Sequence, residues 1–162
     1  MAASLYSASI NRFGRYKAMH IARLKAAQSD RDFIWRAYES AYQNVVERQF
    51  GTWEAELQMP AFDEKWRQGG FEVLALNGKS VGAVWVTNEG EFLRLRDLFL
   101  LAEYQGRGVG AHIVRQELEK ARVLGVPLRL RVLKQSQAIA LYERLGFTIC
   151  GETSTQYWME VN

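Results

Sequence analysis

A glycine-rich loop constrains this 162-residue chain more than any other feature: Gln105-Gly106-Arg107-Gly108-Val109-Gly110-Ala111. It follows an apolar, strand-like segment and precedes residues whose apolar side chains recur at helical spacing. A helix N-terminus carries unpaired N–H groups and the positive end of the helix dipole, and glycines let an anion come close to them. The loop therefore predicts a strand–loop–helix unit that binds a pyrophosphate-bearing ligand, with Arg107 adding a charge contact at the rim.

Two common nucleotide-binding patterns fit this loop poorly. A Walker A site would need Gly-Lys-Ser/Thr, which the loop lacks. A dinucleotide fingerprint can be drawn as Gly106-x-Gly108-x-x-Ala111, but the next predicted strand is followed by Lys134 where a ribose-binding acid is expected. A nicotinamide-dependent oxidoreductase is therefore the weakest of the alternatives.

Strand and helix patterns alternate around the loop. The Asn77-Gly78 pair predicts a hairpin, and residues 71–100 read as a three-stranded antiparallel meander. The unit from 92 to 134 predicts a right-handed parallel crossover. Strands are expected at 19–26, 71–76, 80–87, 92–100, 128–132, 147–151 and 156–161. One helix is expected after Asp30, with Ile34, Tyr38, Ala41 and Val45 on one face, and another from the glycine-rich loop to Leu124. Two shorter helices are expected at 62–68 and 138–145. The pattern predicts an α/β (α+β) fold with helices on both faces of a mixed sheet.

Two spaced motifs resemble those of the GNAT superfamily of N-acetyltransferases. Residues 103–110 are similar to its signature Gln/Arg-x-x-Gly-x-Gly/Ala, and Tyr142-Glu143-Arg144-Leu145-Gly146-Phe147 is similar to a second motif about thirty residues on. The likeness covers residues 71–161 and extends over 19–70 only through the order of strand and helices. It implies the GNAT fold, a mixed central sheet of six or seven strands flanked by about four helices, in a single domain over residues 19–162.

The resemblance also implies acetyl-CoA as co-substrate. The amides of residues 106–111 would hold its pyrophosphate. The backbone of Leu98, Phe99 and Leu100 would pair with the pantetheine arm where the sheet splays, often at a bulge. Members of the family often carry an Asn before the helix bearing the tyrosine, where this chain has Gln135-Ser136-Gln137. The full set of implied cofactor-binding residues is Leu98, Phe99, Leu100, Gln105, Gly106, Arg107, Gly108, Val109, Gly110, Ala111, Ser136 and Ala138.

Tyr142 is the predicted general acid, since its family position lies next to the thioester sulfur. A phenol has a reference pKa of about 10 and is protonated at neutral pH, so it can donate to a departing thiolate. The backbone N–H of Leu100 is a candidate donor to the developing oxyanion. In the alternative interpretation, Tyr142 only packs its short helix.

Asp97 is the predicted general base, because family members often take the base from an acid on the strand before the pyrophosphate loop. Glu91 and Glu103 are weaker candidates. Arg94, Arg96 and Asp97 could equally form a solvated face or a strand ion pair.

The predicted function is direct transfer of an acetyl group from acetyl-CoA to a primary amine of a small molecule or peptide, through a ternary complex. The acceptor is expected to lie near the aromatic-rich residues 33–66, most of which should belong to the core. No pattern identifies the amine. The alternative is a non-catalytic acyl-CoA-binding sensor or interaction module. C-terminal strand exchange is one route to a homodimer.

Charge and composition limit the kinds of partner that the chain is expected to bind. The chain has a net charge of +3, which resides in the acid-free segment 1–18, so residues 19–162 are balanced and a nucleic-acid partner is not expected. That segment is expected to be a disordered arm, with a transit peptide as the alternative.

No apolar run is long enough for a membrane span. Cys150 is the only cysteine, which excludes a cysteine-rich zinc site, and with only His20 and His112 the chain is poorly supplied for metal catalysis, so no metal is expected. A reducing cytoplasm is the simplest compartment.

Overall fold

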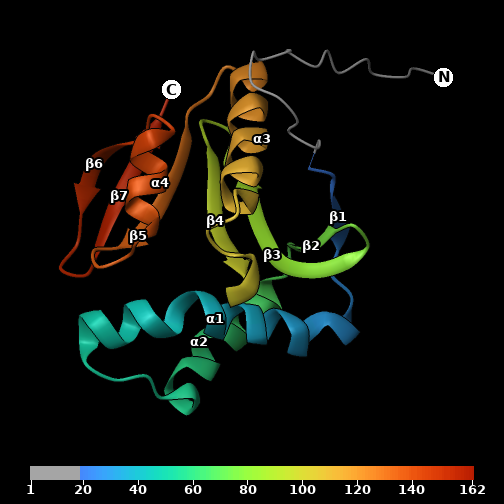
Figure 1. Cartoon of the computed structure of the whole chain (residues 1–162). Helices are drawn as coiled ribbons and strands as arrows, with labels where there is room; N and C mark the ends of the chain where they lie inside the picture. The colour runs from blue at the N-terminus through green and yellow to red at the C-terminus, as the bar shows by residue number, and fades with distance from the viewer. Residues whose placement is uncertain (1–18) are drawn as a thin grey trace.

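A computed structural model describes residues 19–162; the predicted arm at 1–18 lies outside them. The described chain forms one seven-stranded sheet with four α-helices and two short 3₁₀ helices (Figure 1). The elements are β1 (Ile21–Lys25), η1 (Gln28–Asp30), α1 (Arg31–Phe50), α2 (Ala55–Gln68), β2 (Phe71–Leu76), β3 (Lys79–Asn88), β4 (Leu93–Leu100), η2 (Ala102–Tyr104), α3 (Val109–Leu124), β5 (Leu128–Leu133), α4 (Ala138–Arg144), β6 (Thr148–Glu152) and β7 (Gln156–Val161).

The strand order in the sheet is β1-β2-β3-β4-β5-β7-β6. Strands β2, β3 and β4 form the predicted antiparallel meander, and β5 returns parallel to β4 after the α3 crossover. Strands β5, β7 and β6 then continue as an antiparallel set. The mixed sheet and its four helices confirm the predicted fold class.

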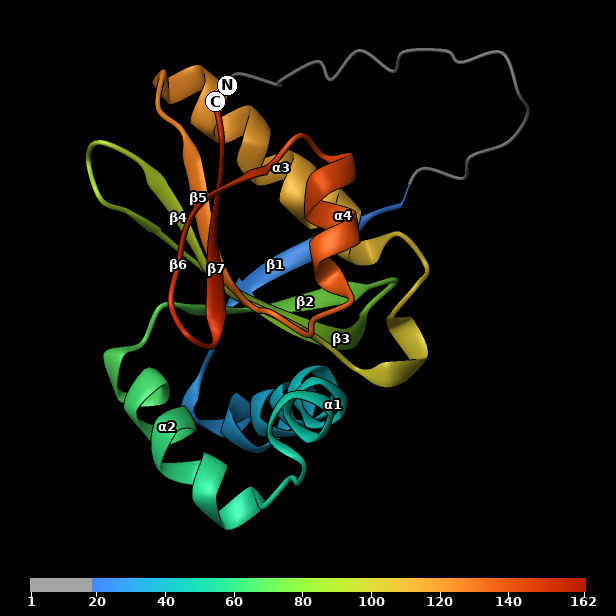
Figure 2. The ribbon, with the colours of Figure 1, turned by 90° about the vertical axis from the view of Figure 1, so that its left-hand side faces the viewer.

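Helices cover both faces of the sheet. Figure 2 shows α1 and α2 on one side and α3 and α4 on the other. The α3 side buries a core with aliphatic side chains such as Ile113, Val114 and Leu128, whereas the α1 side buries an aromatic cluster around Tyr38. That cluster confirms that most aromatic residues of 33–66 belong to the core. Within residues 19–162, no helix is long and apolar enough to cross a bilayer.

Helix α2 begins seven residues before the predicted start at Phe62. The helix therefore contains Pro60, although a helix-interior proline removes one backbone hydrogen bond. Pro60 is exposed, however, and the helix around it is held by tertiary packing. Phe62 is fully buried in the aromatic cluster, and Met59 and Trp66 pack against it. Packing of this face outweighs the local cost of the proline.

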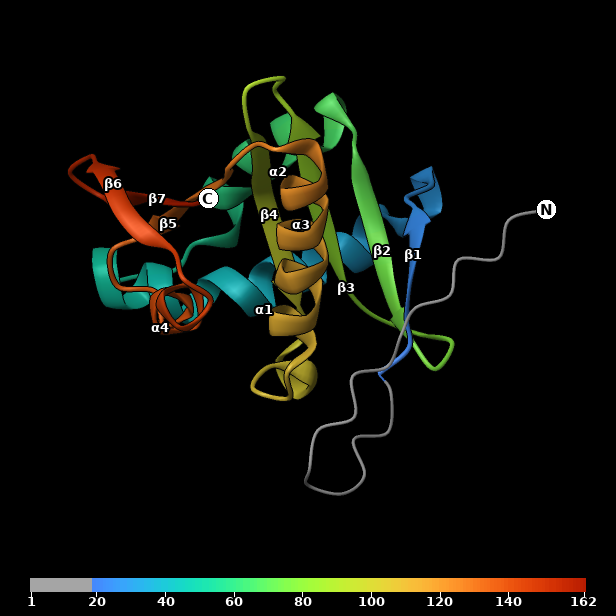
Figure 3. The ribbon, with the colours of Figure 1, turned by 90° about the horizontal axis from the view of Figure 1, so that it is seen from above.

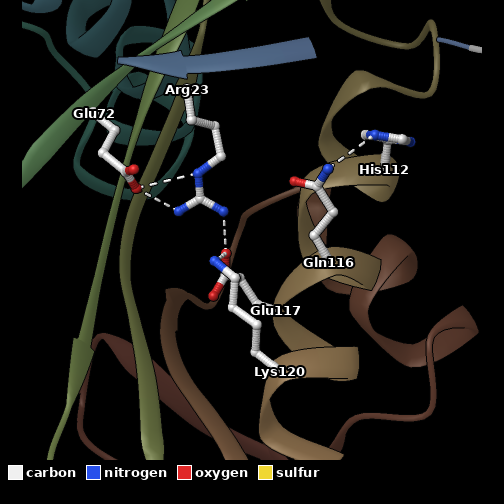
Figure 4. A network of polar contacts seen from close by, with 6 residues as sticks. All are labelled: Arg23, Glu72, His112, Gln116, Glu117 and Lys120. Atoms are coloured by element: carbon white, nitrogen blue, oxygen red, sulfur yellow. Dashed lines mark hydrogen bonds and ion pairs between the residues drawn. The ribbon is translucent and has the colours of Figure 1, made fainter. Parts of the chain in front are cut away.

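A buried ionic network ties α3 to the first strands, as Figure 4 shows. Glu117 on α3 is only 1% exposed, and it pairs with Arg23 of β1 and with Lys120 at 2.9 Å. Arg23 also pairs with Glu72 of β2 at 2.5 Å. Each charged group in the network has a partner, as burial of charge requires. The network fixes the position of α3 over the sheet, and α3 carries the glycine-rich loop at its N-terminus.

Candidate active site

The sheet opens beside a bulge in β4. Trp85 of β3 lies opposite Asp97, but the next residue of β3, Val86, lies opposite Leu95, so Arg96 is an extra residue in β4. Beyond this point β4 no longer pairs with β5, because their register covers only Leu93–Leu95 with Leu128–Leu130. Figures 1 and 3 show the two strands diverging beyond this pairing. The bulge and the divergence form the predicted splay.

The opening exposes backbone groups of β4 that have no strand partner. The N–H of Leu101 donates to the carbonyl of Val81 in β3 at 3.0 Å. Because backbone groups alternate along a strand, those of Leu98 and Leu100 point the other way, toward the gap. The Gln105 side-chain amide donates to the Leu100 carbonyl at 2.8 Å from that side. The Leu98 and Leu100 amides are therefore available to an extended ligand.

The glycine-rich loop turns into α3 at the edge of this opening. Gly106 and Gly108 have φ values of +69° and +83°, in the left-handed region that favours glycine. Gly108 is the N-cap residue of α3, and no side chain within residues 19–162 caps this terminus. The first amides of α3 thus remain free to bind an anion.

These parts line a cleft of about 490 Å³, within the usual size range of ligand sites. Both predicted catalytic residues, Asp97 and Tyr142, line it. The predicted cofactor-binding residues in its wall are Leu98, Leu100, Gln105, Gly106, Gly108, Gly110, Ala111, Ser136 and Ala138.

Three predicted cofactor-binding residues have side chains outside the cleft wall. Phe99 and Val109 are buried on the two opposite core faces, so only their backbone can serve a ligand in the cleft. Arg107 is exposed and does not line the cleft. Gln105 does line it, but its side-chain amide also donates to the carbonyl of Ser40 at 3.2 Å and so anchors the loop to α1.

Tyr142 stands in the cleft wall from α4, with its ring 5.6 Å from that of Phe147. Burial, aided by the negative charge of Asp97, raises the pKa of Tyr142 to about 12. Burial and then Asp97 also raise the pKa of Tyr42, on α1, well above its ordinary value. Both phenols are therefore protonated at neutral pH and can act as hydrogen-bond donors.

Asp97 follows the bulge and is 4% exposed. Its Oδ1 accepts a bond from Lys65 Nζ of α2 at 2.5 Å, whereas Oδ2 is buried with no hydrogen-bond partner among residues 19–162. Burial raises the pKa of Asp97 above its ordinary value, although Lys65, Arg96 and Arg94 oppose that rise. A buried carboxylate with one free oxygen is suited to accept a proton or an amine N–H.

A second cavity of about 190 Å³ is also lined by Asp97. Its wall shares Tyr42, Leu95, Arg96, Asp97 and Arg131 with the larger cleft. Lys65, Trp85, Arg94 and Gln156 complete it. The site thus consists of two spaces that meet at the Asp97 carboxylate.

Helix α1 joins the two halves of the splayed sheet. The side-chain amide of Gln49 donates to the Thr155 carbonyl at 2.9 Å, and its oxygen accepts from the Gln135 N–H at 3.1 Å. Ala41, Tyr42, Val45 and Arg48 of the same helix line the cleft. The motifs did not indicate these residues, because α1 reaches the site only through the packing of distant segments. Of the four, only Tyr42 carried a signal, as part of the aromatic-rich region.

Sequence comparison identifies the class of protein to which this fold belongs. A family model described as the acetyltransferase (GNAT) domain matches residues 67–149, about half of the chain. This chain belongs to the GNAT acetyltransferase family.

Relatives within the family are distant. An uncharacterised N-acetyltransferase of Methanocaldococcus jannaschii is 33% identical over 90 residues, which are 49% of this chain and only 39% of that protein. The PaiA N-acetyltransferase of Thermoplasma acidophilum, solved in complex with coenzyme A, has a TM-score of 0.70 at 16% identity, covering 88% of this chain and 98% of that one. The ribosomal-protein-S18-alanine N-acetyltransferase of Escherichia coli has a TM-score of 0.63 at 19% identity, covering 88% and 93%. These two solved structures show the same fold.

Proposed function

We propose that residues 19–162 act as one domain that transfers the acetyl group of acetyl-CoA directly to a primary amine. The observation that carries the proposal is the meeting of two spaces at Asp97. One space has the free amides for an acyl-CoA, and the other, smaller space is available to an acceptor. Direct transfer needs both substrates to be present together, and two spaces that share one carboxylate allow this.

The larger cleft offers hydrogen-bond partners to both the pyrophosphate and the pantetheine arm of the acetyl-CoA donor. The α3 N-terminus, with its left-handed Gly106 and Gly108, offers amides and a helix dipole to the pyrophosphate. The Leu98 and Leu100 backbone groups offer strand-like hydrogen bonds to the amides of the pantetheine arm. Ser136 lines the cleft as well, although its hydroxyl already accepts a bond from the Ala138 N–H at 3.2 Å. The bound donor would supply an acyl thioester at the opening beside Asp97.

Three groups of this chain then serve the transfer. The free Oδ2 of Asp97 accepts a proton from the incoming amine, directly or through water. The Leu100 N–H donates to the acyl oxygen as negative charge develops on it. Tyr142, held protonated by its raised pKa, donates a proton to the departing sulfur. The single cysteine is consistent with a reducing compartment, and we propose a cytoplasmic location.

Initial-rate kinetics test the proposal. Thiol release from acetyl-CoA, measured while both acetyl-CoA and a primary amine are varied, should give intersecting double-reciprocal lines because both substrates must be bound before transfer. Parallel lines would indicate an acetyl-enzyme and contradict direct transfer. Acetyl-CoA binding without turnover of any amine would favour the non-catalytic sensor instead.

A further inference from the structure

The second cavity is strongly basic. Four cationic side chains line it, and Asp97 is the one carboxylate among its lining residues in the described chain, 19–162. Lys65 is held by Asp97, and Arg96 lies over the Trp85 ring at 4.3 Å with Glu89 at 3.8 Å. Two of the four cationic side chains therefore have a carboxylate partner. The other two are Arg94 and Arg131.

Arg94 and Arg131 have no ion pair with any carboxylate of residues 19–162. Arg131 lies over the Trp158 ring at 4.9 Å, which orients the guanidinium but does not neutralise it. Burial, and then the charges of Arg131 and Arg96, lower the pKa of Arg94. The fold therefore gathers mutually repelling cations around this cavity.

Arg129 shows that this sheet face can neutralise its arginines. It lies two residues before Arg131 on β5, pairs with Glu160 of β7, and lies over the Phe92 ring at 4.4 Å. It lines neither cavity. Among the arginines of β4 and β5, the two without an ion pair, Arg94 and Arg131, both line the cavity, whereas Arg129, which does not line it, is paired.

We propose that the acceptor is an amine that also carries an anionic group, a carboxylate or a phosphate, which Arg94 and Arg131 bind while the amine faces the Asp97 carboxylate. The inference rests on the proposed function and specifies its substrate class. A zwitterionic acceptor matches both parts of the cavity, because its cationic end meets the one carboxylate and its anionic end meets the unpaired guanidinium groups. Polyamines would bring further positive charge to a basic wall and are disfavoured.

Matched acceptor pairs test this substrate class. The wild-type protein is assayed for thiol release with amino acids and their carboxamides, with phosphoethanolamine and ethanolamine, and with spermidine. We expect a preference in kcat/KM of about 10- to 100-fold for the anionic member, as expected for a charge-assisted hydrogen bond. The amino-acid pairs test for a carboxylate, and phosphoethanolamine with ethanolamine tests for a phosphate, so the two kinds of anion are distinguished. Equal rates within each pair, or faster acetylation of spermidine, would overturn the inference and leave acetyl transfer itself intact.

Arginine variants test whether Arg94 and Arg131 cause the preference for anionic acceptors. Arg94→Gln combined with Arg131→Gln should remove most of the preference within each pair and raise KM for the anionic acceptor. Because Arg131 also lines the larger cleft, Arg94→Gln alone is the variant that should weaken the preference with acetyl-CoA binding retained. Arg129→Gln is the matched control, and its preference should equal that of the wild type. A double variant that keeps the preference would contradict the assignment. Acetyl-CoA binding with no turnover of any panel member would count against both the anionic acceptor and the proposed transfer, whereas failure to bind acetyl-CoA would refute the donor itself.

Discussion

Replacing Tyr142 with phenylalanine should lower kcat about 100-fold, the usual contribution of a positioned general acid. The change removes only the hydroxyl, so the packing of the ring against Phe147 remains and acetyl-CoA affinity should stay close to that of the wild type. Stopped-time assays of thiol release at saturating substrates, with calorimetric titration of acetyl-CoA, measure both quantities. The pKa of about 12 means that Tyr142 stays protonated across the assay range, so the loss should be similar at every pH.

Tyr157→Phe is the matched control for this variant. Tyr157 of β7 packs against the α3-side core and lies outside the cleft wall, with Lys134 Nζ 5.1 Å from the centre of its ring. Its kcat should match that of the wild type. If Tyr142→Phe also turned over at the normal rate, Tyr142 would be a packing residue and the proton for the thiolate would need another source.

Asp97→Asn should also lower kcat about 100-fold, because the amide cannot accept the proton of the amine. Asparagine has nearly the same shape, so the bulge and the fold should persist. In the wild type the base must be ionised, and kcat therefore falls as pH falls through the pKa of Asp97. Burial raises that pKa, so the acid limb should lie above the range of an ordinary aspartate. The pH dependence of kcat at saturating substrates measures this limb, which should be absent in Asp97→Asn.

Lys65→Met gives an independent test of the same assignment. The Lys65 ammonium bonds to Oδ1 of Asp97 and opposes the rise in its pKa. Its removal should therefore shift the acid limb to higher pH, with kcat at the plateau less affected. An acid limb that stays at the wild-type position in both Lys65→Met and Asp97→Asn would exclude Asp97 as the base.

Local patterns predicted much of this architecture. The meander and crossover followed from the Asn77-Gly78 turn and from the change of hydrophobic period after the glycine-rich loop, both of which are short-range signals. The loop itself predicted an anion site, and the structure places free α3 amides there. The motif around Tyr142 predicted a residue that lies in the cleft wall. Short-range signals were sufficient where one loop or one helix forms that part of the site.

Local sequence patterns could not predict the contacts between segments that lie far apart in the chain. Lys65 and Asp97 lie 32 residues apart and meet only because α2 folds over the same side of the sheet as α1. Gln49 joins two loops that lie 86 and 106 residues further along the chain. Arg94 and Arg96 could have formed a solvated face in the sequence, and only the pairing of β4 beside β5 brings Arg131 into the same cavity as Arg94. The acceptor side of the site depends on such contacts, which is why the sequence left the amine open.

Calorimetric titration of the protein with acetyl-CoA, and in parallel with NAD, tests the central claim most directly. Gly110→Asp is a useful variant here, since its side chain would extend toward Leu98, Leu100 and Leu141 in the cleft wall, and the added negative charge and bulk should weaken acetyl-CoA binding. For the wild type we expect one acetyl-CoA site with a Kd on the order of micromolar and no heat from NAD. An absence of acetyl-CoA binding, or binding of NAD in its place, would contradict the account of the cleft.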